Sequence, residues 1–535
     1  ALGADVLADQ AAQARHAGRE LDLPRNHAAV GGGARARLGG RRARFGCGRR
    51  AAIVERALFA AGRHEWLLTL AETEGRAERV RYFLPLALAW EDDDDERMKQ
   101  LAPSALAKVR QQAQVGLMAD AVGDAAFCRA LVEAVGSRRE VAAAGGVIRF
   151  APTTAFGRVV GEPRRTDGSM HVLSMSSNSV VLIDERLFLK IYRRAREGTS
   201  PELEMGRFLT DVARFPHCVP VAGSVEYVDR DGTSTTLALL QAFAPNQGDA
   251  WTYAVDALLR HLDACRPLAA GEPAPGSDGL LALIDTLGRR TAQLHAALSM
   301  YTGDAAFDPE PLLAADVAGW VGQVRDRALA LLDQLSTRAE SLPAELRRDA
   351  RRLLAARTRL LGRLDRLALL APSGVRTRLH GDYRLGKVLL ASNDFVIIDF
   401  EGDPARPLQE RRRKQPALRD VASMLRSFDD VCDEALRRID DGGTEQALAA
   451  RAADWLQATR NAFLEAYRQE AVRLGLYAGP PAFASAEPLL ELAELEMALD
   501  ELRRRIDHRP ERAGMPLAAV AALAEQGLPQ EEGDG

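Results

Sequence analysis

Apolar and polar residues alternate in two separate parts of the chain, and this period-two pattern predicts two strand-rich regions. In the first region, residues 66–70 and 80–90 are predicted strands. In the second, residues 180–183, 187–192 and 235–243 are predicted strands. The two regions are separated by residues 104–135, where Leu106, Val109, Val115 and Leu117 suggest one apolar face of a helix.

Helical spacing dominates the second half of the chain. Ser200 and Pro201 form a typical helix start, which predicts a short helix over residues 201–213. After Asn246 the predicted helices are long, and only one small β element, at residues 388–400, interrupts them. The long helices are predicted at 280–298, 316–335 and 344–370.

Composition adds few constraints. The chain has 535 residues and a net charge of −4, so we expect neither nucleic acid nor an anionic membrane as a partner. The five cysteines are scattered and none forms a C-x-x-C pair, which argues against a disulfide framework or a zinc site. We find no apolar run long enough to span a bilayer, and we expect a cytoplasmic protein.

Two acidic motifs carry the candidate chemistry. His380-Gly381-Asp382 follows a helix and precedes a short strand, and Asp399 ends the next apolar strand. A carboxylate that accepts a hydroxyl proton and a second that binds Mg²⁺ are what phosphoryl transfer requires. Asp382 is the predicted base, His380 is expected to hold the loop by hydrogen bonding, and Asp399 is the predicted metal ligand.

Phosphoryl transfer also needs a cation near the nucleotide phosphates. Lys190 lies on the predicted strand 187–192, on the face opposite Leu189 and Ile191. Glu204 on the following helix is the carboxylate predicted to steady it. Taken alone, Lys190 could be an edge-strand lysine and Glu204 could pair with Arg207 on the surface.

A strand-rich part followed by a larger helical part predicts an α+β chain with a bilobal, protein-kinase-like fold. Residues 1–50 are rich in Ala, Gly and Arg and are expected to be poorly ordered or non-native. The remaining predicted parts are an N-terminal cap subdomain (51–165), a β-rich ATP-binding lobe (166–243), a helical catalytic and substrate lobe (244–528) and a tail (529–535).

The motifs resemble those of bacterial maltokinases, which occur alone or fused behind trehalose synthase. The most specific stretches follow one another through the helical part, and the resemblance extends over about residues 51–520. The matching segments are 82–87, 177–180, 201–209, 245–253, 379–383, 398–408, 410–414 and 418–428.

This resemblance implies transfer of the ATP γ-phosphate to the anomeric hydroxyl of maltose, with Mg²⁺ as cofactor and a trehalose synthase as possible partner. It implies that Lys190 and Glu204 orient ATP and that residues 240–243 form the adenine hinge. The other residues to which it gives a role are Ser177 and Ser179 in the phosphate loop, Gln241 and Phe243 in the hinge, and Arg406, Glu501 and Arg509 at the substrate.

The chain also departs from the maltokinase pattern. Five residues after the base, Lys387 replaces a glutamine, and an ammonium there would repel Mg²⁺ or replace one metal ion. Arg384 replaces a histidine. On the last long helix, Met497, Asp500, Arg504 and Arg512 replace lysine and aromatic residues.

These departures leave two alternatives to maltose phosphorylation. One is a related sugar kinase with another glucose-containing acceptor, which the altered helix favours. The other is a catalytically weak module that binds nucleotide or glycan, which Lys387 favours.

Overall fold

The computed structural model describes residues 51–525, apart from short stretches within this range. These stretches are residues 75–78, 92–94, 162–168, 176–177, 269–271, 273–275, 277, 339, 341, 370–373, 440–444 and 511–512. The described residues form two compact units. The first contains the chain up to Asp211 and Val219–Ala244, and the second contains Val212–Cys218 and the chain from Pro245. The expectations for residues 1–50 and 529–535 lie outside the described residues.

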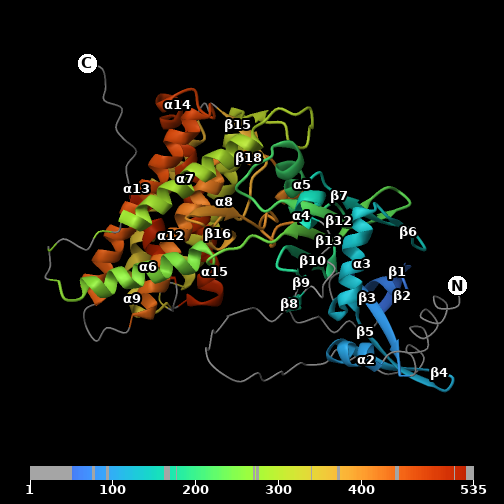
Figure 1. The fold of residues 1–535 in the computed structure, drawn as a ribbon. Helices are drawn as coiled ribbons and strands as arrows, with labels where there is room; N and C mark the ends of the chain where they lie inside the picture. The colour runs from blue at the N-terminus through green and yellow to red at the C-terminus, as the bar shows by residue number, and fades with distance from the viewer. Residues whose placement is uncertain are drawn as a thin grey trace, which may run out of the picture. The chain divides into compact units, whose positions relative to one another are not determined.

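The first unit begins with an antiparallel sheet of six strands. Five of them follow the order β1-β2-β3-β5-β4, and β11 pairs with β3 on the side. Figure 1 shows β1 to β5 in blue to cyan, at the N-terminal end of the described chain. Their bounds are β1 Ala51–Ala61, β2 His64–Glu74, β3 Arg79–Trp90, β4 Ala105–Gln111, β5 Gln114–Asp120 and β11 Arg194–Ala195.

A second sheet of seven strands completes the first unit, in the order β6-β7-β12-β13-β10-β9-β8. It joins strands from the predicted cap, β6 and β7, to strands from the predicted ATP lobe, so the boundary placed at residue 165 divides a continuous sheet. The bounds are β6 Glu140–Ala142, β7 Gly146–Pro152, β8 Met170–Met175, β9 Asn178–Ile183, β10 Leu187–Tyr192, β12 Val221–Asp229 and β13 Ser234–Ala242.

One aromatic core joins these sheets to a helix. Phe59 of β1 stacks on Phe150 of β7 with ring centroids 5.3 Å apart, and Trp66 of β2 lies 5.6 Å from Phe127 of α3. All four rings are almost fully buried, which makes them the main apolar contribution to this interface. The helices of this unit are α2 Asp95–Leu101, α3 Ala125–Gly136, α4 Phe156–Val160 and α5 Pro201–Arg207, the last followed by a π-helical turn at Phe208–Val212.

The helix predicted over residues 104–135 is wrong for its first half. Residues 105–120 form the hairpin of β4 and β5, and only Ala125–Gly136 is helical. The turn is made by Gln112, whose φ of 53° lies in the left-handed region that a helix interior does not allow. Lys108 and Arg110 are exposed on alternate positions, a strand signal that the helical spacing of the apolar residues concealed.

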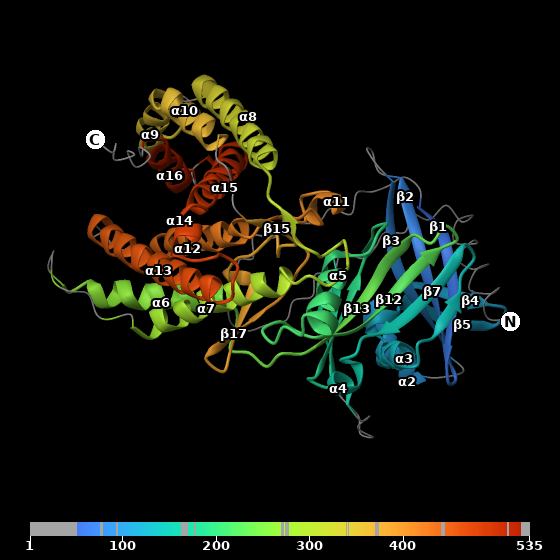
Figure 2. The ribbon, with the colours of Figure 1, turned by 90° about the horizontal axis from the view of Figure 1, so that it is seen from above.

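The second unit is largely helical. Figure 2 shows α6, α7, α12 and α13 in one group and α8, α9, α10, α15 and α16 in another. The predicted helix 344–370 is divided at Ala356. The bounds are α6 Ala250–Cys265, α7 Asp278–Leu298, α8 Ala314–Arg338, α9 Ala344–Ala355, α10 Arg357–Leu367, α11 Leu408–Arg411, α12 Leu418–Arg438, α13 Glu445–Arg473, α14 Pro480–Ala484, α15 Glu487–His508 and α16 Gly514–Glu525.

Small β elements hold the functional loops of this unit. The predicted element at 388–400 is the hairpin of β16 (Val388–Ala391) and β17 (Asp394–Ile397), and it is confirmed. A second small sheet contains β14 (Glu310–Pro311), β15 (Val375–Thr377) and β18 (Gln415–Pro416). The α+β prediction therefore holds, with most strands in the first unit and most helices in the second.

Among the described helices, none combines the length and the apolar character needed to cross a membrane.

Candidate functional site

Lys190 lies in the middle of the seven-stranded sheet, as predicted. Its strand β10 is paired on both sides, with Val180 of β9 and Leu239 of β13 opposite Lys190. The side chain is 90% buried, and its Nζ donates a hydrogen bond of 2.8 Å to Glu202 Oε2. The hydroxyl of Tyr192 donates to the same oxygen at 2.5 Å. The lysine is thus a central-strand residue with an anchored ammonium.

The structure pairs Lys190 with Glu202, to which the sequence analysis gave no role, and the predicted pair of Lys190 with Glu204 stays a prediction. Glu202 and Glu204 lie two residues apart on α5, so they project from nearly opposite faces of the helix. Glu202 shares the buried face with Met205 and Leu209 and is only 2% exposed. That helical period was visible in the sequence and could have identified Glu202.

Ser177 and Ser179 were predicted to line the phosphate loop. Ser177 lies outside the described residues. Ser179 is fully buried, and its hydroxyl accepts a hydrogen bond of 2.7 Å from Arg193 Nε. Arg193 in turn pairs with Asp120 at 2.5 Å. Ser179 therefore belongs to a buried polar network of the first unit, because the alternation of β9 turns it inward, and its assignment to the phosphate loop is wrong.

The predicted adenine hinge is an extended segment at the end of β13. Gln241 lies opposite Phe188 in the register of β10 and β13. The Phe243 amide donates to the Arg186 carbonyl at 2.6 Å, and the rings of Phe243 and Phe188 stack with centroids 6.4 Å apart. The segment is fixed by backbone and ring contacts, and its role in adenine binding remains a prediction.

In the second unit, the catalytic loop depends on a residue to which the sequence analysis gave no role. Asp420, near the start of α12, is almost fully buried. Its Oδ2 accepts the amide of His380 at 2.8 Å, and its Oδ1 accepts the amide of Gly381 at 3.0 Å. The sequence held one indication of this role. Asp420 lies on the same helix face as Met424 and Ser427, which are both buried.

Glycine is required at position 381 for two reasons. Its φ of 77° is in the left-handed region, and a Cβ there would approach Gly402 Cα to 3.2 Å. The close approach brings the catalytic loop against the segment that follows Asp399.

His380 makes the hydrogen bond within the loop that was predicted for it, and its part in catalysis stays a prediction. It is almost fully buried, and its Nε2 lies 2.9 Å from the Ile398 carbonyl, one residue before Asp399. The Asp382 amide approaches its Nδ1 at 3.4 Å. Burial lowers the pKa of His380, which favours a neutral ring that donates from Nε2 and accepts at Nδ1.

A further buried histidine supports Asp420. His295 Nε2 lies 3.6 Å from Asp420 Oδ2, and its Nδ1 lies 2.9 Å from the Tyr467 hydroxyl. Burial alone would raise the pKa of Asp420, but His295 and the Gly381 amide outweigh it and lower the pKa below 3.8. Asp420 is thus an ionised carboxylate held inside the helical unit.

Asp382 projects from this loop and remains partly accessible. Its two oxygens lie 3.3 Å from the guanidinium of Arg384. Burial raises the pKa of Asp382; the charges of Arg384 and Lys387 oppose this shift, whereas that of Asp403 adds to it. A carboxylate with a raised pKa is a better proton acceptor than an exposed aspartate.

Asp399 comes directly after β17 and meets Lys387. Lys387 Nζ donates to Asp399 Oδ2 at 2.8 Å. A carboxylate is a suitable ligand for Mg²⁺, but an ammonium has no lone pair to offer and holds one of the two oxygens. With the ammonium of Lys387 on one oxygen of Asp399, these two residues fit one divalent cation better than two.

The residues predicted to bind substrate fall in different places. Arg406 lies 3.6 Å from Asp403 Oδ2 and 3.9 Å from Glu496 Oε1. Because Asp403 also acts on the pKa of Asp382, Arg406 connects the catalytic loop with α15. Arg509 is exposed at the end of α15.

Glu501 forms ion pairs with Arg504 and Arg505 of its own helix. Arg505 also forms an ion pair with Asp433 of α12, at 3.1 Å. This places Glu501 in an interhelical ion network. A sugar-binding role for Glu501 and Arg509 stays a prediction, and their placement lends it no support.

Glu496 is the centre of a charged cluster that the sequence analysis missed. Its carboxylate is 3% exposed and accepts hydrogen bonds from Trp320 Nε1 at 2.7 Å and Arg327 at 2.6 Å. Arg419 pairs with it at 2.7 Å and lies over the Trp320 ring at 4.6 Å. Arg327 also reaches Asp500 at 2.8 Å. Burial alone would raise the pKa of Glu496, but Arg419, the Trp320 indole, Arg327 and Arg406 outweigh it and lower the pKa, so the carboxylate stays ionised.

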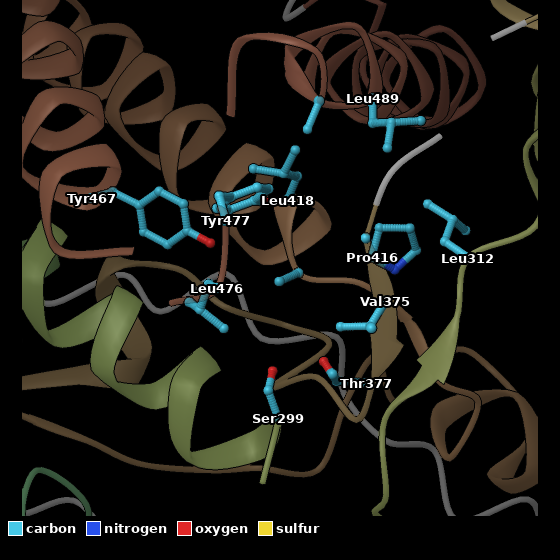
Figure 3. Close-up of a pocket in the computed structure, with 13 residues that line it drawn as sticks. Ser299, Leu312, Val375, Thr377, Pro416, Leu418, Tyr467, Leu476, Tyr477 and Leu489 are labelled. Atoms are coloured by element: carbon cyan, nitrogen blue, oxygen red, sulfur yellow. The ribbon is translucent and has the colours of Figure 1, made fainter. Parts of the chain in front are cut away.

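A cavity of about 30 Å³ lies in the second unit, away from Asp382. Figure 3 shows Thr377, Leu418 and Tyr467 among the side chains that line it. Small-molecule sites enclose about 300–1,000 Å³, so this cavity is too small for a sugar. Its walls lie next to Leu379-His380 and Asp420 in the chain, and it belongs to the packing behind the catalytic loop.

The role of Asp420 can be tested by unfolding. The pKa of Asp420 is lower in the folded state than in the unfolded state, so its carboxylate stabilises the fold fully at pH values above the unfolded-state pKa. This stabilisation is lost as the pH falls through the folded-state pKa. Asp420→Asn should therefore lower the free energy of unfolding by about 2–3 kcal/mol at pH 7. Urea unfolding at pH 7 and near pH 3 should show a smaller difference at the lower pH. Asp433→Asn, a more exposed change on the same helix, is the control, and a loss for Asp420→Asn that does not depend on pH would contradict this role.

Comparison with known proteins places this geometry in a family. The model of the phosphotransferase enzyme family matches residues 172–471. The glucosamine kinase of Mycolicibacterium smegmatis is 32% identical over 308 residues, which cover 57% of this chain and 67% of that enzyme. That of Streptacidiphilus jiangxiensis is 32% identical over 238 residues, 44% of this chain and 47% of that enzyme. The chain thus spans about half of the Streptacidiphilus enzyme.

The solved structures agree at the level of the fold. A glucosamine kinase in complex with glucosamine, ADP and inorganic phosphate aligns with a TM-score of 0.61 at 24% identity, covering 89% of this chain and 94% of that one. This supports the predicted fold, with a β-sheet N lobe and a helical C lobe. These relatives are glucosamine kinases and not maltokinases. The resemblance is therefore corrected: the comparisons support the phosphotransferase enzyme family, and not maltokinase in particular. Since the family model spans more than half of the chain, the chain belongs to the phosphotransferase enzyme family.

Proposed function

We propose that this protein transfers the γ-phosphate of ATP to a hydroxyl of an aminated hexose of the glucosamine type. Membership of the phosphotransferase enzyme family and the glucosamine kinases among its relatives support the reaction class. The observation that carries the choice of acceptor is a set of carboxylates linked through Arg406 and Arg327, namely Asp403, Glu496 and Asp500, of which Asp403 also acts on the pKa of Asp382.

These carboxylates are arranged around Arg406 and Arg327. Asp403 and Asp500 are the accessible ones, with side chains 41% and 38% exposed, whereas Glu496 is buried beneath them. An ammonium group on a sugar would gain charge-assisted hydrogen bonds from such oxygens. Maltose carries no charge and would gain no charge-assisted hydrogen bond of this kind from Asp403 or Asp500, which would keep Arg406 and Arg327 as their partners.

The residues of the helical unit supply the chemistry at the acceptor. Asp382 takes the proton of the attacking hydroxyl, and its raised pKa suits this task. Arg384 lies against both of its oxygens and restricts its orientation. Asp399 would hold Mg²⁺, which when bound neutralises charge on the phosphates of ATP.

The first unit contributes a fixed cation. Glu202 and Tyr192 hold the ammonium of Lys190 in one position. A positioned ammonium stabilises the charge of nucleotide phosphates without having to reorganise during the reaction. Lys190 and Glu202 are therefore the proposed pair for orienting ATP.

Maltose, with a trehalose synthase partner, remains the second candidate because of the motifs at 379–383 and 398–428. The replacement of an aromatic position by Asp500 argues against it. A weak nucleotide-binding module is a third candidate, and absence of turnover with every acceptor would favour it.

The acceptor can be tested by steady-state kinetics with ATP and either glucosamine or glucose. We expect a higher kcat/KM for glucosamine, and Asp500→Asn should lower it by roughly tenfold to a hundredfold while changing the value for glucose little. Asp507→Asn, an exposed change on the same helix, is the matched control, and Asp382→Asn should be inactive. Equal losses for both sugars in Asp500→Asn would refute ammonium recognition at this position.

The partner of Lys190 can be tested with two variants of one helix. Glu202→Gln removes a negative charge 2.8 Å from the buried ammonium of Lys190, so the dissociation constant for ATP should rise by about tenfold or more. Glu204→Gln should change it much less. Isothermal titration of ATP into both variants measures this, and a larger effect from Glu204→Gln would reverse the assignment.

A further inference from the structure

Lys387 is fixed in place by its backbone before its side chain is considered. It ends the short 3₁₀ turn Leu385–Lys387, and its amide donates to the Arg384 carbonyl at 2.8 Å. Its own carbonyl accepts the amide of Ile398 at 3.0 Å. Lys387 is thus tied both to the loop that carries Asp382 and to the strand end that carries Asp399.

The side chain then spans the gap to Asp399. Its Nζ lies 2.8 Å from Asp399 Oδ2, and the two side chains are 21% and 35% exposed, so the pair is accessible to a ligand. Asp399 has a φ of 61°, a left-handed conformation that is unfavourable for an aspartate. The direction of this carboxylate is therefore imposed by the fold and not by the local preference of the chain.

An ammonium in this position changes what the site can hold. In protein kinases, two Mg²⁺ ions are held by an aspartate at the position after a strand and by an amide side chain of the catalytic loop. Lysine is a donor only and cannot ligate a cation. A second divalent ion beside Asp399 would meet a positive charge that is already bonded to the carboxylate.

We propose that the ammonium of Lys387 takes the place of one metal ion, so that the nucleotide is bound with a single divalent cation at Asp399. This inference rests on the proposed use of ATP. Lys387 would supply to the phosphates the positive charge that a second cation otherwise gives, while Asp399 Oδ2 keeps the ammonium oriented. The acceptor sugar has no part in this inference.

The count of bound metal ions tests the proposal directly. Mn²⁺ binding is followed by electron paramagnetic resonance with saturating non-hydrolysable ATP analogue, for the native protein and for Lys387→Gln and Lys387→Met. We expect one Mn²⁺ per protein in the native chain. Lys387→Gln should bind two, because the amide oxygen can ligate. Lys387→Met, which lacks both the charge and a ligand, should bind one and lose turnover.

The possible results separate this inference from the proposed function. Two Mn²⁺ ions on the native protein, or the same number on the native protein and Lys387→Gln, would overturn the role of Lys387 even if sugars are phosphorylated. One ion on the native protein and two on Lys387→Gln would support it even if no tested sugar is an acceptor, in which case only the proposed acceptor fails.

Discussion

The hydrogen bonds from the amides of His380 and Gly381 to the buried carboxylate of Asp420 fix the rest of the catalytic geometry. They set the loop, and His380 then reaches the carbonyl of Ile398 and positions the residue that follows, Asp399. A buried charge is costly unless it is fully bonded. Here the cost is offset by the two amides and by His295, so a rigid loop follows from a single ionised group.

From this loop the site extends outward as a series of opposite charges. Asp382 faces Arg384, Asp399 faces Lys387, and Arg406 connects Asp403 with the cluster around Glu496. Each pair limits where its carboxylate can point, which is what a phosphoryl transfer site needs. In the proposed account, the accessible carboxylates at the outer end favour a cationic acceptor, and Lys387 at the inner end takes the place of one metal ion.

Much of this arrangement followed from the sequence, and the failures have physical causes. The alternation around Lys190 predicted a central strand, and the spacing from His380 to Asp399 predicted the loop and hairpin. The pairing of Lys190 with Glu202 was not predicted, because it depends on which face of the short helix α5 is buried. The hairpin at 105–120 was mistaken for a helix because four apolar residues imitate a helical stripe. Asp420 and Glu496 could not be assigned, since their partners are distant in the chain.

The central claim is that the carboxylates of Asp403 and Asp500 select an aminated sugar. The most direct measurement is a competition in one tube, with ATP, Mg²⁺ and equal concentrations of glucosamine, glucose and maltose, followed by phosphorus NMR. The account predicts that the first phosphomonoester to accumulate is that of glucosamine, with little product from the neutral sugars. Phosphorylation of glucose or maltose at an equal or higher rate would contradict it.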